Sequence, residues 1–121
     1  MNGWLVVAAV NGFLAVAAGA FGAHGLRGSH DPQSMSVFET AALYHMFHAL
    51  AIGIAAVALR GSGSTNWAGW FFLIGIVLFC GSLYLLALTG VRGLGIVTPF
   101  GGLAFLVGWA ALAYAAWKTV Q

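Results

Sequence analysis

The chain has 121 residues, of which 62% are hydrophobic and only 5% are charged, and its formal net charge is +2. Water-soluble domains usually place Asp, Glu, Lys or Arg at about a quarter of their positions, because these side chains solvate the surface. The composition therefore excludes a water-soluble globular domain and indicates that membrane lipid surrounds most of the chain. The basic residues form no cluster, so we expect no nucleic-acid partner.

Four apolar stretches follow one another along the chain, and each has the roughly 20 residues that a helix needs to cross about 30 Å of hydrocarbon. They cover residues 4–26, 38–59, 67–88 and 94–117. None of them alternates between apolar and polar residues as a barrel strand does. We predict one all-α domain over residues 1–121, a polytopic membrane protein with four antiparallel transmembrane helices in a compact bundle and both termini on one side.

Small residues recur every three or four positions in the first stretch, so they form a narrow stripe along a helix. Close packing across small residues is a main source of helix association in lipid. We therefore predict helix-packing roles for Gly12, Gly19, Gly81, Gly101 and Gly102. An alternative for the first stretch is a cleavable signal peptide, because Ala18 and Ala20 flank Gly19 in an A-x-A pattern. The stretch lacks the basic start and the short apolar core of such a peptide, so we expect it to be permanent.

Two different signals mark the start of the second helix. Asp31 before Pro32 suits an N-cap followed by the first helical position, whereas Ser36 and Glu39 match the S-x-x-E capping box. The sequence leaves both starts open. For Glu39 we expect a capping role, since a carboxylate in the first turn also interacts favourably with the helix dipole, and a proton-transfer or ligand-binding role is the alternative.

Polar residues inside the spans are the candidates for function, because ionisable groups in hydrocarbon are costly unless they have partners. We group them as a polar seam of His24, Tyr44, His45, His48, Ser82 and Thr98. On a helix, His45 and His48 share one face with Tyr44, and the short connection lets His24 approach them. Asn11 and Tyr84 are further candidate partners.

Three interpretations of these histidines stay open. Neutral imidazoles can bond between helices and fix their register, which we favour. His24, His45 and His48 could instead supply three nitrogens to a metal or a haem, although the sequence contains no established ligand motif and we expect no cofactor. A third interpretation is a path that relays protons or small polar solutes.

The last two stretches add two local features. Cys80 lies inside the third span and cannot form an intramolecular disulfide, because it is the only cysteine. Thr98 and Pro99 suit an N-cap and a first helical residue, so the fourth helix could begin there, after a short re-entrant or extended piece over residues 94–97.

Four motifs together resemble the YgdD/YwdK family of small bacterial inner-membrane proteins. They are G-A-F-G-A-H-G-L at Gly19 to Leu26, Y-H-x-x-H at Tyr44 to His48, F-C-G-S-L-Y at Phe79 to Tyr84, and T-P-F-G-G at Thr98 to Gly102, followed by Gly108 and Trp109. The resemblance covers all four predicted helices. It implies a multi-pass inner-membrane protein of unknown function, and it supplies no substrate or catalytic residue.

We expect no enzyme activity, because the sequence shows no nucleophile with its base, no carboxylate pair and no phosphate loop. The leading hypothesis is a structural or accessory membrane subunit that forms a homo-oligomer or packs against a larger membrane complex. The alternative is a carrier or channel for protons, metal ions or a small polar solute that uses the polar seam.

Overall fold

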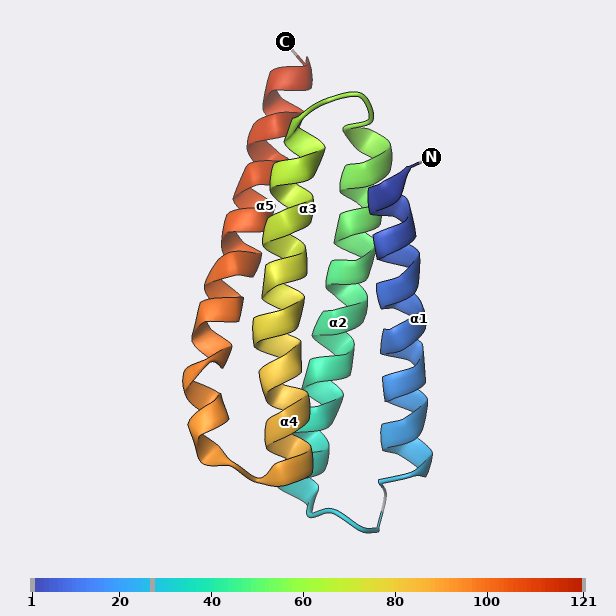
Figure 1. Ribbon diagram of the computed structural model, residues 1–121, viewed down its shortest axis with the longest axis vertical. Coiled ribbons are helices and arrows are strands. Elements are labelled where there is room, and N and C mark those ends of the chain that lie inside the picture. The colour runs from blue at the N-terminus through green and yellow to red at the C-terminus, as the bar shows by residue number, and fades with distance from the viewer. Residues whose placement is uncertain (1, 27, 121) are drawn as a thin grey trace.

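The computed structural model describes residues 2–26 and 28–120, and this part of the chain is almost entirely helical and contains no strand (Figure 1). The elements, in chain order, are α1 (Gly3–His24), α2 (Pro32–Ala58), α3 (Ser64–Gly75), the π-helix η1 (Ile76–Cys80), α4 (Gly81–Thr89), the 3-10 helix η2 (Arg92–Ile96) and α5 (Thr98–Val120). The all-α prediction is confirmed. Compared with the expected stretches, the second span begins six residues earlier, at Pro32 instead of residue 38.

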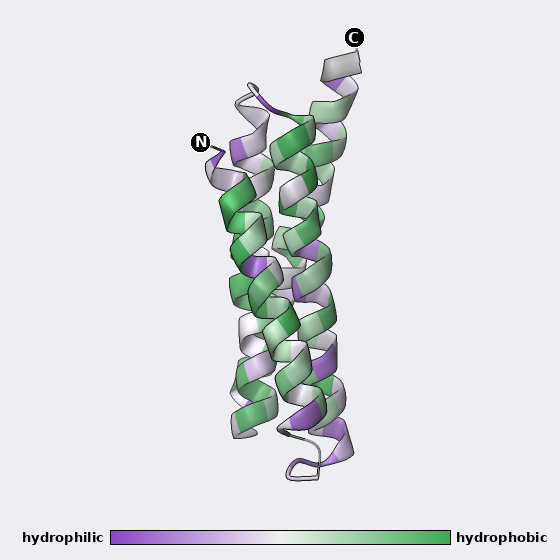
Figure 2. Cartoon of the chain, turned by 90° about the vertical axis from the view of Figure 1, so that its right-hand side faces the viewer, coloured by the Kyte–Doolittle hydropathy of each residue, from purple (hydrophilic) through white to green (hydrophobic). Residues whose placement is uncertain are grey.

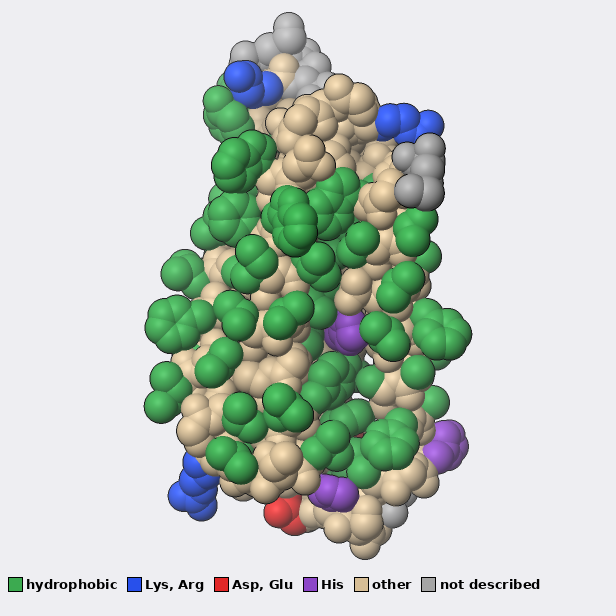
Figure 3. Space-filling view, in the orientation of Figure 1, with side chains coloured by type: hydrophobic (Ala, Val, Ile, Leu, Met, Phe, Trp, Pro, Cys, Tyr) green, Lys and Arg blue, Asp and Glu red, His purple; other side chains and the backbone are tan. Residues whose placement is uncertain are grey.

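Four helical segments are long and apolar enough to cross a membrane: Gly3–His24, Pro32–Ala58, Ser64–Thr89 and Arg92–Lys118. The third combines α3, η1 and α4 into one continuous rod. Hydrophobic side chains cover the middle of the molecule, whereas Lys and Arg lie at both of its ends (Figure 3). The hydropathy of the chain shows the same division, with most hydrophilic residues near the ends of the helices (Figure 2). Both termini lie at one end (Figure 1).

The two central segments are α2 and the α3–η1–α4 rod, and each carries one outer helix. α1 packs along α2, while α5 packs along α3 and η1 (Figure 1). The two outer helices scarcely touch each other. Ile52 of α2 and Phe72 of α3 are completely buried at the centre. The arrangement leaves α1 with a single main neighbour, so much of its surface faces the surroundings of the bundle.

The start of α2 is set by Asp31 and Pro32. The Asp31 carboxylate accepts a hydrogen bond from the backbone N–H of Ser34 at 2.6 Å, and this bond lowers the pKa of Asp31. Pro32 occupies the first helical turn, where its missing N–H costs nothing. The predicted capping role of Ser36 and Glu39 is wrong. Both lie inside the helix, because the Asp31 cap has already satisfied the first turn upstream of them.

The start of α5 matches the predicted break at Pro99, but its details differ. The residues before it form the 3-10 helix η2 instead of an extended piece. The carbonyl of Val97 accepts the N–H of Phe100 at 3.1 Å, which begins the helix. The Thr98 hydroxyl does not cap the helix and instead bonds to Ser82.

Close packing between the segments depends on glycines that face aromatic rings or backbone. A Cβ at Gly101 would collide with the backbone of Phe79, and a Cβ at Gly75 would collide with the ring of Phe105. Gly108 against Phe72 and Gly69 against Trp4 are nearly as tight, and a Cβ on either glycine would lie 2.7 Å from the nearest ring atom. These contacts hold α5 and α1 close to the third span.

The glycines predicted to pack divide into two groups. Gly101 lies against the Phe79 backbone, and Gly102 lies beside the ring of Phe79, where a Cβ would be 3.8 Å from Cδ2. A Cβ at Gly12, Gly19 or Gly81 would meet no atom within 4 Å. Contrary to expectation, those three glycines make no close helix contact within the chain.

Candidate functional site

His45 lies at the centre of a hydrogen-bonded chain that joins three helices. Its Nε2 is 3.0 Å from Oδ1 of Asn11 on α1, and its Nδ1 is 3.0 Å from the hydroxyl of Tyr84 on α4. The side chain of Asn11 in turn donates from Nδ2 to the carbonyl of Val7 at 2.9 Å. His45 and Asn11 are both buried. The imidazole therefore ties α2 to both of its neighbours.

The partners of His45 fix the direction of these bonds. Because the Asn11 amide nitrogen donates to Val7, its Oδ1 is the atom that accepts. Nε2 of His45 must therefore carry a hydrogen, and in a neutral imidazole Nδ1 then accepts the hydrogen of the Tyr84 hydroxyl. The donors run from Tyr84 through His45 to Asn11, and the chain ends at a backbone carbonyl.

His48, one turn later on α2, makes a second link between helices. Its Nδ1 is 2.7 Å from the carbonyl oxygen of Tyr44, and its Nε2 accepts the indole N–H of Trp109 on α5 at 3.1 Å. Its ring stacks on Phe105 with centroids 3.5 Å apart and an angle of 10° between the planes. These contacts attach α5 to α2 across the centre of the bundle.

The bonds of His48 permit one neutral tautomer. Trp109 can only donate and the Tyr44 carbonyl can only accept, so Nε2 of His48 is bare and Nδ1 carries the hydrogen. His45 has the opposite arrangement. A second proton on His48 would lie on Nε2, where its N–H would face the N–H of Trp109. A second proton on His45 would lie on Nδ1, where it would face the Tyr84 oxygen, which can accept a hydrogen bond.

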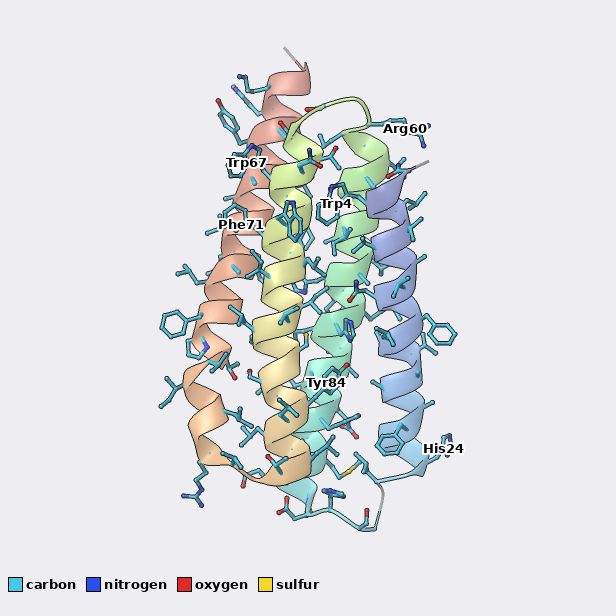
Figure 4. All side chains as sticks on the ribbon, viewed as in Figure 1. Trp4, His24, Arg60, Trp67, Phe71 and Tyr84 are labelled. Carbon is cyan, nitrogen blue, oxygen red and sulfur yellow. The ribbon has the colours of Figure 1, made fainter. Side chains whose placement is uncertain are left out.

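The three predicted metal ligands do not converge. His24 is exposed and points away from the bundle at the far end of α1 (Figure 4), and both ring nitrogens of His45 and of His48 already have partners. Among the residues that the structure describes, no three His, Cys, Asp or Glu side chains are grouped as a metal site. His24 therefore lies outside the site that contains the other two histidines.

Ser82 and Thr98 form a third, separate link, at the start of α5. The Ser82 hydroxyl donates to the carbonyl of Phe79 at 3.0 Å, so the Thr98 hydroxyl donates to Ser82 at 2.6 Å. Phe79 belongs to the π-helix η1, and short π-helical irregularities are frequent at functional sites. The link holds the broken start of α5 against this irregular turn.

The predicted polar seam is thus three short chains instead of one continuous path. His45, His48 and the pair of Ser82 and Thr98 each join two or three segments, and within the described residues no hydrogen bond connects one chain to the next. Throughout residues 2–26 and 28–118, every buried side-chain nitrogen and oxygen has a hydrogen-bond partner. Tyr44 differs: the residue is 39% exposed, and its hydroxyl makes no hydrogen bond with any described residue.

Trp109 donates to His48 but is absent from the predicted polar seam, and this is the main omission of the sequence analysis. The signal was the depth of Trp109 in the fourth span, since an indole N–H far from the headgroups needs an acceptor from another helix. Asn11 and Tyr84 were named as candidate partners, and the structure joins both of them to His45.

Comparison with known proteins places the chain in a family. Residues 18–102 match the family model described as "Protein of unknown function (DUF423)". A UPF0382 membrane protein of Staphylococcus epidermidis is 46% identical over 119 residues, which cover 98% of each chain. UPF0382 membrane proteins of Staphylococcus aureus and of Bacillus subtilis, the latter named YwdK, are each 45% identical, again with 98% of each chain covered. No solved structure matches the chain.

These relatives confirm the resemblance found in the sequence motifs and the membrane location. Since the matched residues extend from the end of α1 to the start of α5, they include both buried histidines and the Ser82–Thr98 link. The chain belongs to the DUF423 family of unknown function and is a membrane protein like its UPF0382 relatives.

Proposed function

We propose that this chain is a structural or accessory subunit of the bacterial plasma membrane, and that it assembles through its outer helix α1 with a transmembrane helix of a second copy. The histidines on α2 serve this role by fixing the positions of the other helices. The observation that carries the proposal is a groove along the exposed side of α1 and α2.

The groove has a volume of about 650 Å³ and lies between the facing surfaces of α1 and α2. Its lining is apolar throughout and includes two glycines, Gly12 and Gly53. The other lining residues are Leu5, Ala8, Ala9, Met46, Ala49, Leu50, Ile54, Val57 and Ala58. Gly12 leaves open space there, since a Cβ on it would meet nothing within 4 Å. Small residues with open space above them let a second helix approach closely, and this packing drives association in lipid.

The buried polar groups support a structural role over transport. A proton relay needs a group that can gain and release a proton while its partners adjust. His48 is held between a pure donor and a pure acceptor, which favours a fixed neutral ring. The three polar chains are also separate, which supports helix clamps more than a continuous pathway.

The proposal includes no catalytic step and places the chain in the plasma membrane. The connections at residues 25–31, 59–63 and 90–97 are short, which leaves little room for an active site outside the membrane. Apolar helical spans are typical of plasma-membrane proteins, whereas outer membranes hold barrels. Cell fractionation of the tagged protein tests this location.

The assembly test measures the subunit mass of the purified protein in mild detergent by light scattering, at several protein concentrations. We expect an oligomer for the wild type and a monomer for Gly12→Leu, because leucine would fill the groove. Ala17→Leu is the matched control: it adds a larger side chain to the same helix, about 140° from Gly12, and should leave the oligomer intact. A wild-type monomer at all concentrations would contradict self-association.

A further inference from the structure

We propose that a second pocket, between α2, η1 and α5, binds the planar carbonyl-bearing ring of a membrane-soluble quinone, with Tyr44 donating a hydrogen bond to a ring oxygen. The inference does not depend on self-association, because this pocket shares no residue with the groove between α1 and α2.

The pocket has the size and the walls of a small-molecule site. Its volume is about 600 Å³, within the range of about 300–1,000 Å³ typical of ligand pockets. Aromatic rings line it from three segments: Tyr44 and His48, Phe79, and Phe105 and Trp109. The Tyr44 ring lies 4.8 Å from that of Phe79 and nearly parallel to that of Phe105, with an angle of 23° between the planes. Flat walls of this kind favour a flat ligand.

Among the side chains that line this pocket, only one polar group lacks a hydrogen-bond partner. Trp109 and His48 are hydrogen-bonded to each other, whereas the Tyr44 hydroxyl has no hydrogen-bond partner among the described residues. An unpaired hydroxyl in hydrocarbon is unfavourable, so the ligand should supply an acceptor oxygen. No charged side chain lines the pocket, which argues against an anionic or cationic group.

The depth of the pocket separates a quinone ring from a phospholipid. Tyr44 lies about 18 Å along α2 from Pro32 and about 21 Å from Ala58, close to the middle of the span. Phospholipid headgroups and ester carbonyls stay near the membrane surface, whereas a quinone ring on a hydrocarbon tail can enter the bilayer core. Leu103 and Leu106 at the edge of the pocket are 58% and 69% exposed, so the opening faces the lipid.

The structure holds the walls of the pocket in place. Gly101 packs closely against the backbone of Phe79. The hydrogen bond between Ser82 and Thr98 fixes the start of α5 next to Pro99, which also lines the pocket. The ring of His48 is held by its stack on Phe105 and by its bond to Trp109. A pocket with fixed walls loses less entropy on binding than one that must form around its ligand.

The test measures equilibrium binding of radiolabelled decylbenzoquinone to the full-length protein in nanodiscs of synthetic phosphatidylcholine. We expect saturable binding that Tyr44→Phe weakens about tenfold, since this change removes only the hydroxyl and about 1.4 kcal/mol corresponds to a factor of ten. Tyr114→Phe is the matched control, because Tyr114 is exposed on α5 outside the pocket, and it should bind as tightly as the wild type. Gly102→Leu should abolish binding by filling the pocket, with Gly102→Ala as its folding control.

Decylbenzene, which has the same tail and a ring without oxygens, distinguishes the ring acceptor from simple apolar binding. It should compete at least tenfold more weakly than decylbenzoquinone. Equal competition would mean that the pocket accepts alkyl chains without selecting a carbonyl, and it would overturn the proposal. Absence of saturable binding, or equal affinity of the wild type and Tyr44→Phe, would also overturn it.

Discussion

The indole N–H of Trp109 donates to Nε2 of His48 at 3.1 Å, and this bond joins two helices through residues that are 61 positions apart in the chain. Among the described residues, no other side-chain hydrogen bond joins α2 to α5, and this one lies beside the stack of His48 on Phe105. Because the indole has no acceptor capacity, the bond also determines which nitrogen of His48 is bare.

Trp109→Phe should therefore destabilise the folded protein by about 0.6–2 kcal/mol, because it leaves Nε2 of His48 without its donor in hydrocarbon. The measurement is reversible unfolding in mixed micelles of mild detergent and sodium dodecyl sulfate. Trp67→Phe is the matched control: Trp67 is 69% exposed, and its indole bonds to no described residue. Equal losses for the two variants would show that the His48 bond contributes nothing.

Asn11 and His45 should be energetically coupled, since each is the other's partner across α1 and α2. A double-mutant cycle with Asn11→Ala and His45→Ala should give a coupling free energy of about 0.6–1.7 kcal/mol. The same cycle with Asn11→Ala and His48→Ala should be close to additive, because these two side chains share no partner. Similar coupling in both cycles would contradict separate polar chains.

The neighbouring glycines 101 and 102 should differ sharply in their tolerance of a methyl group. Gly101→Ala would force its Cβ into the Phe79 backbone and should cost about 1–3 kcal/mol. Gly102→Ala would place its Cβ 3.8 Å from the nearest Phe79 atom, an ordinary contact, and should leave the free energy of unfolding nearly unchanged. Equal free energies of unfolding for the two variants would mean that α5 does not approach the π-helix η1 as closely as described.

The start of α2 should loosen at acid pH because of Asp31. Its lowered pKa means that the ionised carboxylate stabilises the fold at pH values above the unfolded value near 3.9, and this stabilisation is lost as the pH falls through the lower folded pKa. Hydrogen exchange of the first turn of α2 should rise in that acid range, and Asp31→Asn should remove the pH dependence. Glu39→Gln should retain it, whereas its loss in that variant would restore the capping role predicted for Glu39.

The sequence predicted the parts of the structure that depend on local patterns. Apolar length located the four spans, and the Asp31–Pro32 and Thr98–Pro99 pairs marked the breaks next to helix starts. The competing signal at Ser36 and Glu39 failed, since a capping motif has no effect where an upstream cap has already begun the helix.

The relative positions of the helices could not be obtained from local patterns. The contact of Gly101 with Phe79 and that of Gly108 with Phe72 fix the position of α5 along the axis of the third span. In this position Trp109 lies next to His48. Proximity in the chain was also misleading for His24. The connection after α1 is short, but the last turn of α1 directs this side chain away from α2 (Figure 4).

The most direct test of a structural role for the histidines is nitrogen-15 nuclear magnetic resonance of the imidazole side chains, with the protein at pH 7 in lipid bilayers and His45→Gln and His48→Gln for assignment. The structure predicts two neutral rings of opposite form, with the hydrogen on Nδ1 of His48 and on Nε2 of His45. A protonated His48, or the same neutral tautomer at both positions, would contradict the fixed hydrogen bonds that make these residues helix clamps.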